Sequence, residues 1–355
     1  MRDLSENFRG IEPYTPGEQP QNSDRIKLNT NENPYPPSPS VQTALRSFDC
    51  GDLKLYPDPN MSALIDALAA HYGVGRDCVF AGVGSDDVLA TCFMAFFNSG
   101  KPILFPDITY AFYDVWANLF SIDFHRVPLN GAFEIVKEDY YADNGGIVFP
   151  NPNAPTGLDM PAAAIEDILK NNSGVVVIVD EAYIDFGGES ALPLIEKYDN
   201  LVVTRTFSKS RSMAGARVGF AFANPTLIRE LNTIKNSYNS YTLSNLTMKL
   251  ASAALSDEEY FNETVGKIIA TREKYKLKLR ELGFEFPDSK SNFIFATHPK
   301  YRAEELFEAL KASNIYVRHF DAPRIDNYLR ITVGTDEEMR ALTDFFEEYM
   351  REAEK

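Results

Sequence analysis

Short apolar segments alternate with amphipathic stretches from residue 78 to about residue 222. The apolar segments are rich in β-branched residues, and the stretches between them repeat apolar positions at helical spacing. In Val175–Val179 such residues fall on both faces, as in a strand covered by helices on two sides. The alternation predicts an α/β fold with a three-layer, doubly wound, mostly parallel sheet. The expected strands are Cys78–Ala81, Ile103–Phe105, Ile122–Val127, Ile147–Phe149, Val175–Val179, Leu201–Thr206 and Val218–Phe222.

The pattern becomes helical after Asn224. Helices are expected at Pro225–Ser237, at Leu243–Leu255 and from about Asp257 to Leu282. Ser256 and Glu259 have the spacing of a capping box for the last of these helices, and Gly283 follows its end.

The C-terminal part alternates strand and helix again, which predicts a second, smaller α/β unit. Its expected strands are Phe293–Ala296, Ile315–Arg318 and Tyr328–Val333. The proline-rich N-terminal segment has no long helix and is expected to join this unit. We therefore predict an N-terminal arm or lid with part of the small domain over residues 1–45, a large cofactor-binding domain over 46–245, and a small domain over 246–355.

Composition and charge exclude several classes of protein. The chain has 355 residues, 44% of them hydrophobic and 24% charged, which is ordinary for a globular protein. Its net charge of −16 argues against nucleic acid or an anionic membrane as partner. The N-terminus lacks an apolar signal-peptide stretch, and three cysteines without a Cys-x-x-Cys pair do not indicate a disulfide framework. A cytoplasmic protein is expected.

Polar segments follow several of the predicted strands, where ligands of open α/β sheets bind. Asp180 and Glu181 end one strand, where they suit a charged ligand or simply cap the strand. Binding of magnesium and nucleotide is not indicated, because no G-x-x-x-x-G-K-[ST] loop is present. The histidines show no metal-ligand spacing, and no G-x-S-x-G sequence indicates a serine hydrolase.

The segment Gly82–Asp87 lies between a predicted strand and a predicted helix. Asp87 replaces the third glycine of a dinucleotide fingerprint, so that motif is incomplete. Backbone N–H groups at a helix start, with the Ser85 hydroxyl, still suit one phosphate group. A serine at such a place is also a common N-cap.

The segment Thr206–Gly219 places Ser208, Lys209 and Arg217 among small residues. Small residues let the backbone approach a ligand closely, and a lysine there could form an imine with a carbonyl group. A solvated basic loop is the plainer interpretation. The amide-rich segment Asn151–Gly157, after another strand, is otherwise a simple turn.

Taken together, these segments resemble the fold-type I pyridoxal-phosphate aminotransferases, and specifically the histidinol-phosphate aminotransferase family. The resemblance extends from Tyr14 to Thr335, and the order and spacing of its motifs make it specific. The motifs are Leu28-Asn-Thr-Asn-Glu-Asn-Pro34, Tyr56-Pro-Asp-Pro59, Asp180-Glu-Ala-Tyr183, Thr206-Phe-Ser-Lys209 and Leu329-Arg-Ile-Thr-Val-Gly-Thr335.

The resemblance implies a site for pyridoxal 5'-phosphate. Lys209 would bind the cofactor covalently and then act as general acid and base, and Asp180 would pair with the pyridinium nitrogen. Tyr183 would donate to the phenolate oxygen of the ring, and Tyr110 would stack on the ring face. The residues implied at the cofactor phosphate are Ser85, Thr206, Ser208, Arg217 and, from the other subunit of a homodimer, Tyr56. Asp86 is also expected among the cofactor-binding residues.

The resemblance also implies a substrate site for small anions. Arg330 would bind the carboxylate of the amino donor in a bidentate fork. Arg318 would take the phosphate of the substrate or the side-chain carboxylate of glutamate. Tyr14 and Asn31 would belong to the lid.

One position departs from the family pattern. Relatives carry asparagine directly before Pro-Thr-Gly, where it bonds the phenolate oxygen of the cofactor, and this chain has Ala154. Asn153 lies one residue earlier and is expected to replace it if the turn is shifted.

The function implied is transamination between L-histidinol phosphate and 2-oxoglutarate, a step of histidine biosynthesis. An aromatic aminotransferase and a phosphothreonine decarboxylase of the same fold are alternatives. A cofactor-binding regulator would need a DNA-binding domain, for which the chain has neither length nor basic patch. An α/β protein without a cofactor is the plainest alternative.

The charge of −16 does not exclude anionic substrates. The fold has a radius of gyration of about 20 Å and the Debye length is about 8 Å, so distant carboxylates are largely screened from the site. Lys209, Arg217, Arg318 and Arg330 would make the cleft locally positive inside an acidic shell.

Overall fold

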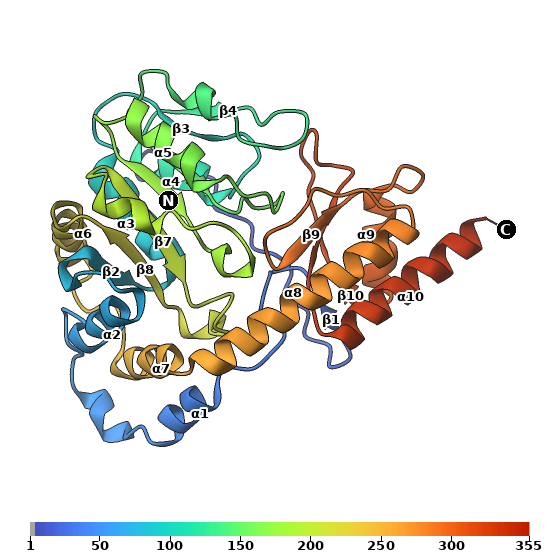
Figure 1. Ribbon diagram of the computed structural model, residues 1–355, viewed down its shortest axis with the longest axis horizontal. Helices are drawn as coiled ribbons and strands as arrows, with labels where there is room; N and C mark the ends of the chain where they lie inside the picture. The colour runs from blue at the N-terminus through green and yellow to red at the C-terminus, as the bar shows by residue number, and fades with distance from the viewer. Residues whose placement is uncertain (1–3, 355) are drawn as a thin grey trace.

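A seven-stranded sheet organises the larger part of the computed structural model, which describes residues 4–354. Its strand order is β2-β8-β7-β6-β5-β3-β4. Figure 1 labels β2, β8, β7, β3 and β4 of this sheet. The strands from β7 to β4 pair in parallel, whereas β8 is antiparallel to both β2 and β7. The strands are β2 Val79–Gly82, β3 Ile103–Pro106, β4 Phe124–Val127, β5 Ile147–Pro150, β6 Val177–Asp180, β7 Leu201–Thr206 and β8 Gly219–Ala223. The predicted mostly parallel sheet is confirmed.

Helices cover both faces of this sheet, so its inner strands alternate between two cores. In β5, Ile147 and Phe149 pack into one hydrophobic cluster with α2, α5 and α7, and Val148 packs into a second cluster with α3, α4 and α6. Because successive residues of a strand point to opposite faces, an inner strand needs apolar residues at every position. The helices of the large unit are α1 Pro39–Arg46, α2 Ser62–Tyr72, α3 Gly84–Phe96, α4 Phe112–Phe120, α5 Ala162–Asn171, α6 Pro225–Tyr238 and α7 Asn245–Ser256.

The predicted capping box at Ser256 and Glu259 is wrong. The long helix α8, Glu258–Glu281, has Asp257 at its N-cap and no side-chain capping bond. Ser256 still belongs to α7, where its hydroxyl donates to the backbone oxygen of Ala253. Two helices adjoin here without a loop between them, so Ser256 ends one helix and cannot cap the next.

The smaller unit joins distant parts of the chain. Strand β12, Leu329–Thr332, lies between β9, Phe293–Ala296, and β11, Arg318–His319, in an antiparallel sheet. The N-terminal β1, Ile26–Lys27, pairs with β10, Ile315–Tyr316, so the N-terminal segment joins this unit as predicted. The helices of this unit beyond α8 are α9 Ala303–Ala312 and α10 Asp336–Ala353.

The expected single strand Ile315–Arg318 is divided between two sheets. Residues 315–316 pair with β1, and residues 318–319 pair with β12. Val317, 3% exposed, lies between them in the small core. The chain therefore changes sheets at this residue and brings Arg318 beside β12.

Helices α7 and α8 connect the two units (Figure 1). Buried residues of α7 pack into a core of the large sheet, and α8 contributes to the small core. The predicted domain division at residue 245 stays a prediction, and this packing favours a boundary near Ser256. No helix in residues 4–354 is long and apolar enough to cross a bilayer.

Candidate active site

Two adjoining cavities, of about 170 and 610 Å³, lie at one edge of the large sheet, and the N-terminal segment and the small unit also line the larger one. The carboxyl ends of β2, β3, β6 and β7 meet at this edge, because β2 runs in the same direction as β7 with the reversed β8 between them. Both cavities are lined by Thr30, Tyr110, Ala154, Tyr183 and Lys209. The predicted site residues that line one or both of them are Tyr14, Asn31, Ser85, Asp86, Tyr110, Asp180, Tyr183, Ser208, Lys209, Arg217, Arg318 and Arg330.

Lys209 lies between the large sheet and the N-terminal segment. It follows β7, and its amine donates to the backbone oxygen of Thr30 over 3.1 Å. The same amine lies 5.7 Å from the centre of the Tyr183 ring. Lys209 lines both cavities.

Asp180 ends β6 and is buried, at 4% exposed. Its carboxylate accepts hydrogen bonds from Thr204 Oγ1 at 3.3 Å, the Ala182 N–H at 3.2 Å and Tyr113 Oη at 3.4 Å. Burial nevertheless raises the pKa of Asp180 to about 7, and the nearby Asp86 adds to the rise. A cationic group placed beside this carboxylate would favour its ionised form.

The sequence did not identify Tyr113 and Thr204 as site residues. Tyr113 is fully buried on α4, and Thr204 is fully buried on β7, beside β6. Both side chains match the apolar period of their elements and resemble core residues. A hydroxyl residue on the strand next to that of Asp180 was the only available signal for Thr204, and Tyr113, on a helix, offered none.

The turn between β2 and α3 packs tightly against Arg217. A Cβ on Gly84, whose φ is +82°, would lie 2.4 Å from an Arg217 nitrogen, and one on Gly219 would lie 2.4 Å from the Ser85 nitrogen. These two glycines therefore allow the first turn of α3 and the Arg217 guanidinium to come together. Asp86 accepts from Arg217 at 3.1 Å. The result is a cradle of N–H donors at a helix start, which suits a phosphate group.

Arg318 and Arg330 lie opposite each other on β11 and β12 and line the larger cavity. Arg330 NH2 donates to the Asn29 backbone oxygen at 3.1 Å, while its buried Nε has no partner among the described residues. Burial lowers the pKa of Arg330, and the Arg318 charge adds to this effect. Within residues 4–354 neither arginine forms an ion pair with a carboxylate, so the pair is suited to binding an anion.

The N-terminal segment covers the site. Asn31, 1% exposed, donates to the Tyr183 hydroxyl at 3.0 Å. Tyr14 stacks on Phe112 with ring centres 4.3 Å apart and lies 6.5 Å from the Tyr110 ring. Tyr110 in turn donates to Asp86 at 2.7 Å.

Asn153 and Thr206 were expected to contact the cofactor, but neither lines these two cavities. The Asn153 amide donates to the Ile108 backbone oxygen at 2.9 Å and accepts from Thr109 at 3.0 Å, so it ties its turn to the loop that follows β3. Ala154 faces the site instead. The Thr206 hydroxyl bonds Ser208 at 3.0 Å and supports that residue from behind.

Tyr56 also does not line either of these two cavities in its own chain. It is 82% exposed and stacks on Tyr241 with ring centres 4.7 Å apart. Leu53 and Leu55, just before Tyr56 in the chain, and Tyr238, three residues before Tyr241, are also exposed. The Tyr238 hydroxyl donates to Asp87 at 2.6 Å, which connects these exposed side chains to the start of α3.

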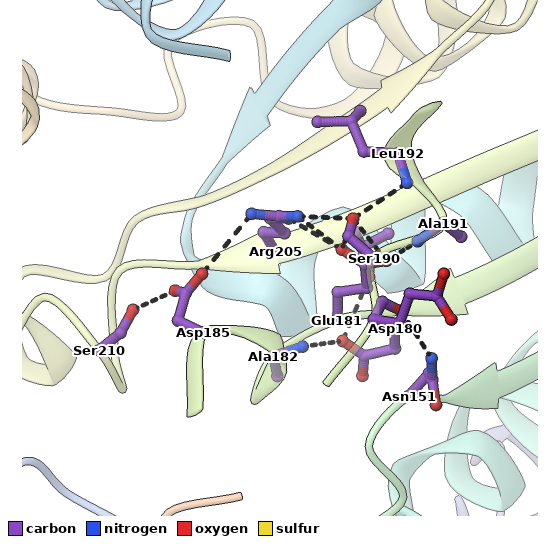
Figure 2. A network of polar contacts seen from close by, with 12 residues as sticks. Asn151, Asp180, Glu181, Ala182, Asp185, Ser190, Ala191, Leu192, Arg205 and Ser210 are labelled. Carbon is purple, nitrogen blue, oxygen red and sulfur yellow. Dashed lines mark hydrogen bonds and ion pairs between the residues drawn. The ribbon is translucent and has the colours of Figure 1, made fainter. Parts of the chain in front are cut away.

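A buried polar network braces the backbone between Asp180 and Lys209 (Figure 2). Glu181, with no exposed side-chain surface, pairs with Arg205 at 2.8 Å and accepts from the Ser190 hydroxyl. Asp185 lies 3.6 Å from Arg205 and accepts from Ser210, the residue after Lys209. Glu181 therefore serves the scaffold, while its neighbour Asp180 faces the site.

The sequence matches the family of class I and II aminotransferases over residues 23–346. Histidinol-phosphate aminotransferase from Lactococcus lactis subsp. cremoris is 50% identical over 349 residues, which cover 98% of each chain.

Two solved structures share the fold. Histidinol-phosphate aminotransferase from Sinorhizobium meliloti, in complex with pyridoxal-5'-phosphate, has a TM-score of 0.85 and 26% identity, covering 92% of this chain and 91% of that one. L-threonine-O-3-phosphate decarboxylase from Porphyromonas gingivalis has a TM-score of 0.77 at 20% identity, covering 91% and 99%, a likeness of fold alone. The chain therefore belongs to the histidinol-phosphate aminotransferase family, within the pyridoxal-phosphate-dependent class I and II aminotransferases.

Proposed function

We propose that this chain transfers an amino group between L-histidinol phosphate and 2-oxoglutarate, yielding imidazole acetol phosphate and glutamate in histidine biosynthesis. The observation that carries the proposal is the placement of the Lys209 amine in one site with the Asp180 carboxylate and with two arginines that lack carboxylate partners. The full-length likeness to the relative from Lactococcus lactis supports the choice of substrates.

The described residues fit pyridoxal 5'-phosphate. Asp180 is a buried carboxyl group whose ionised form would be stabilised by a cationic neighbour, such as a pyridinium nitrogen. The close approach of Gly84, Gly219 and Arg217 leaves a cradle for the phosphate group. When bound, the cofactor supplies an electron sink for the carbanion that forms when the substrate loses its α-proton.

Lys209 is proposed to hold the cofactor and to move the proton. Its amine lies at the boundary of the two cavities, so it can reach a substrate carbon in the larger one. A positioned proton-transfer group contributes about 10²- to 10⁴-fold in rate. Tyr110 and Tyr183 present aromatic and hydroxyl groups to the same space.

The cofactor phosphate is proposed to bind Ser85, Ser208, Arg217 and the first N–H groups of α3. In the structure Arg217 pairs with Asp86, and both groups are partly exposed. Asp86 is held in turn by Tyr110, so it orients the guanidinium at the rim of the cradle.

Arg318 and Arg330 are proposed to bind the anionic groups of the substrates. Arg330 suits the α-carboxylate of glutamate, because its Nε and one NH2 group form the fork that a carboxylate matches. Arg318 suits the second carboxylate of glutamate or the phosphate of histidinol phosphate. Tyr14 and Asn31 close the site from the N-terminal segment.

The active form is proposed to be a cytoplasmic homodimer in which Tyr56 reaches the partner subunit's cofactor phosphate. The 82% exposure of Tyr56 and the exposed apolar side chains near it support an interface there. The cysteines at 50, 78 and 92 are all free, which suits a reducing compartment.

Parallel assays with three substrates test the proposal. The purified chain is given pyridoxal 5'-phosphate and either L-histidinol phosphate or phenylalanine with 2-oxoglutarate, or phosphothreonine alone. We expect glutamate to form fastest with L-histidinol phosphate, and phosphothreonine to release no carbon dioxide. Preference for phenylalanine would indicate an aromatic aminotransferase, and carbon dioxide from phosphothreonine would indicate a decarboxylase.

A further inference from the structure

The Tyr183 hydroxyl has one hydrogen-bond partner among the described residues. Asn31 Nδ2 donates to the Tyr183 oxygen at 3.0 Å. A phenol has one proton to donate, and no acceptor for that proton is found within residues 4–354. Tyr183 lines both cavities, so the proton is left for a group bound there.

The orientation of the Asn31 amide is fixed by Thr332 on β12. The Thr332 hydroxyl accepts from the Asn31 backbone N–H at 3.0 Å and donates to Asn31 Oδ1 at 3.1 Å. Because this places the amide oxygen on Thr332, the amide nitrogen must face Tyr183. Asn292 also donates to the Asn31 backbone oxygen at 3.0 Å, and Asn31 is 1% exposed.

The residue at position 154 makes the direction of the Tyr183 hydroxyl important, because it supplies no other hydrogen-bond donor. Ala154 lines both cavities and offers only a methyl group, while the amide of Asn153 is engaged by Ile108, Thr109 and Thr156. The ring oxygen of the cofactor would therefore depend on the Tyr183 hydroxyl for a donor from this side.

We propose that Asn31 is a positioning residue that acts through Tyr183. By occupying the acceptor side of the hydroxyl, its amide directs the Tyr183 proton into the cavity, toward the ring oxygen of the cofactor. This inference rests on the proposed function. It gives Asn31 a role at the cofactor, beyond its role in the substrate lid.

A pH titration of the visible absorbance of the holoenzyme tests the proposal. A hydrogen bond to the ring oxygen withdraws charge from it and weakens its hold on the proton of the neighbouring nitrogen that joins Lys209 to the cofactor. Loss of the bond should therefore raise the pKa of this chromophore. We expect Asn31→Ala to raise it by about one unit, and Tyr183→Phe to raise it at least as much.

Two comparisons distinguish a positioning role of Asn31 from a general disturbance of the site. Asn33→Ala removes another asparagine of the same segment, whose amide donates to the Ser210 backbone oxygen and not to Tyr183. It should leave the chromophore pKa unchanged. In the Tyr183→Phe background, Asn31→Ala should add nothing, because the hydroxyl it positions is absent. The charged groups that line the smaller cavity, Glu32, Asp86, Asp180, Lys209 and Arg217, are the same in all variants.

Asn31→Asp provides a second test should the alanine variant fail to fold. Aspartate keeps the size of the side chain but has only acceptor atoms. It would therefore accept the hydrogen bond from the Tyr183 hydroxyl in place of the cofactor and raise the pKa of the chromophore further. In the Tyr183→Phe background much of that rise should disappear.

The inference is overturned if Asn31→Ala keeps the wild-type pKa while Tyr183→Phe raises it, or if the two effects add in full. A wild-type holoenzyme without the visible absorbance of a lysine-bound cofactor would overturn the proposed function as well.

Discussion

Arg318 and Arg330 are register partners on adjacent antiparallel strands, so two guanidinium groups enter the larger cavity side by side. Like charges placed directly opposite destabilise a sheet, and within residues 4–354 neither has a carboxylate partner. Aromatic rings take that place: Phe320 lies 5.7 Å from Arg318 and 5.6 Å from Arg330. The two arginines are therefore held side by side despite their mutual repulsion, an arrangement that suits the binding of an anion.

Substitution of either arginine should change kcat/KM differently for glutamate and for L-histidinol phosphate. Glutamate carries two carboxylates, so Arg318→Gln and Arg330→Lys should each lower its kcat/KM by about 10- to 100-fold. L-Histidinol phosphate has one anionic group and should lose that factor with only one of the two variants. Steady-state kinetics with each substrate identifies the arginine that holds the phosphate. Equal, small effects on both substrates would contradict the assignment.

The same repulsion predicts that Arg318→Gln does not destabilise the cofactor-free protein. Its unfolding temperature should equal or exceed that of the wild type, because one of two adjacent cations is removed. A temperature clearly below the wild type in a thermal melt would show that Arg318 has a structural partner.

Asp180 should make the stability of the cofactor-free protein depend on pH. Its folded pKa of about 7 lies above the ordinary value of 3.8. Below pH 4 both states hold the proton. Between about pH 4 and 7 only the folded state keeps it, so stability is lost as the pH rises through this window, by at most about 1.4 kcal/mol per pH unit.

Urea unfolding of the wild type and Asp180→Asn measures this contribution. The decline between pH 4 and 7 should be smaller in the variant, which has no carboxyl group to titrate. Parallel pH profiles for the two proteins would show that Asp180 does not titrate in this range.

Tyr113→Phe should weaken cofactor binding through Asp180. The Tyr113 hydroxyl donates to Asp180 Oδ2 at 3.4 Å and helps to keep it ionised. Its loss should raise the Kd for pyridoxal 5'-phosphate at pH 7 by about 3- to 10-fold, measured by fluorescence or absorbance titration.

Tyr140→Phe is the matched control for that variant. Tyr140 is 1% exposed, and its hydroxyl has no hydrogen-bond partner among the described residues. Its removal should leave cofactor affinity unchanged and leave stability unchanged or raised by about 1 kcal/mol. An equal loss of affinity in both variants would mean that Tyr113 acts only through packing.

Ala154→Asn should restore a second donor to the ring oxygen of the cofactor. We expect the pKa of the holoenzyme chromophore to fall by about half a unit to one unit. Ala154→Leu adds similar volume without a donor and should not lower it. A fall with leucine as well would attribute the effect to volume.

The sheet was predictable because its inner strands are apolar on both faces. The continuous apolar runs Ile147–Phe149 and Val177–Val179 are visible in the sequence alone. Asp180 and Lys209 stood out as candidates because they end or follow such strands, and their expected roles came from the family resemblance. The division of residues 315–318 was not, since it depends on pairing with residues 26–27 and 329–330, far away in the chain.

Side-chain orientation was the other part that the sequence left open. Asn153 and Ala154 are adjacent, and only the fold of the turn decides which one faces the site. Tyr113 has the pattern of a core residue, and its hydrogen bond to Asp180 arises from packing of α4 against β6.

The visible spectrum of the holoenzyme tests the central claim most directly. Glutamate should abolish the absorbance of the lysine-bound cofactor by converting it to the aminated form, and imidazole acetol phosphate should restore it while L-histidinol phosphate is formed. Lys209→Ala should show neither change at a comparable rate. A wild-type spectrum that does not respond to glutamate, or a Lys209→Ala protein that responds equally well, would contradict the account.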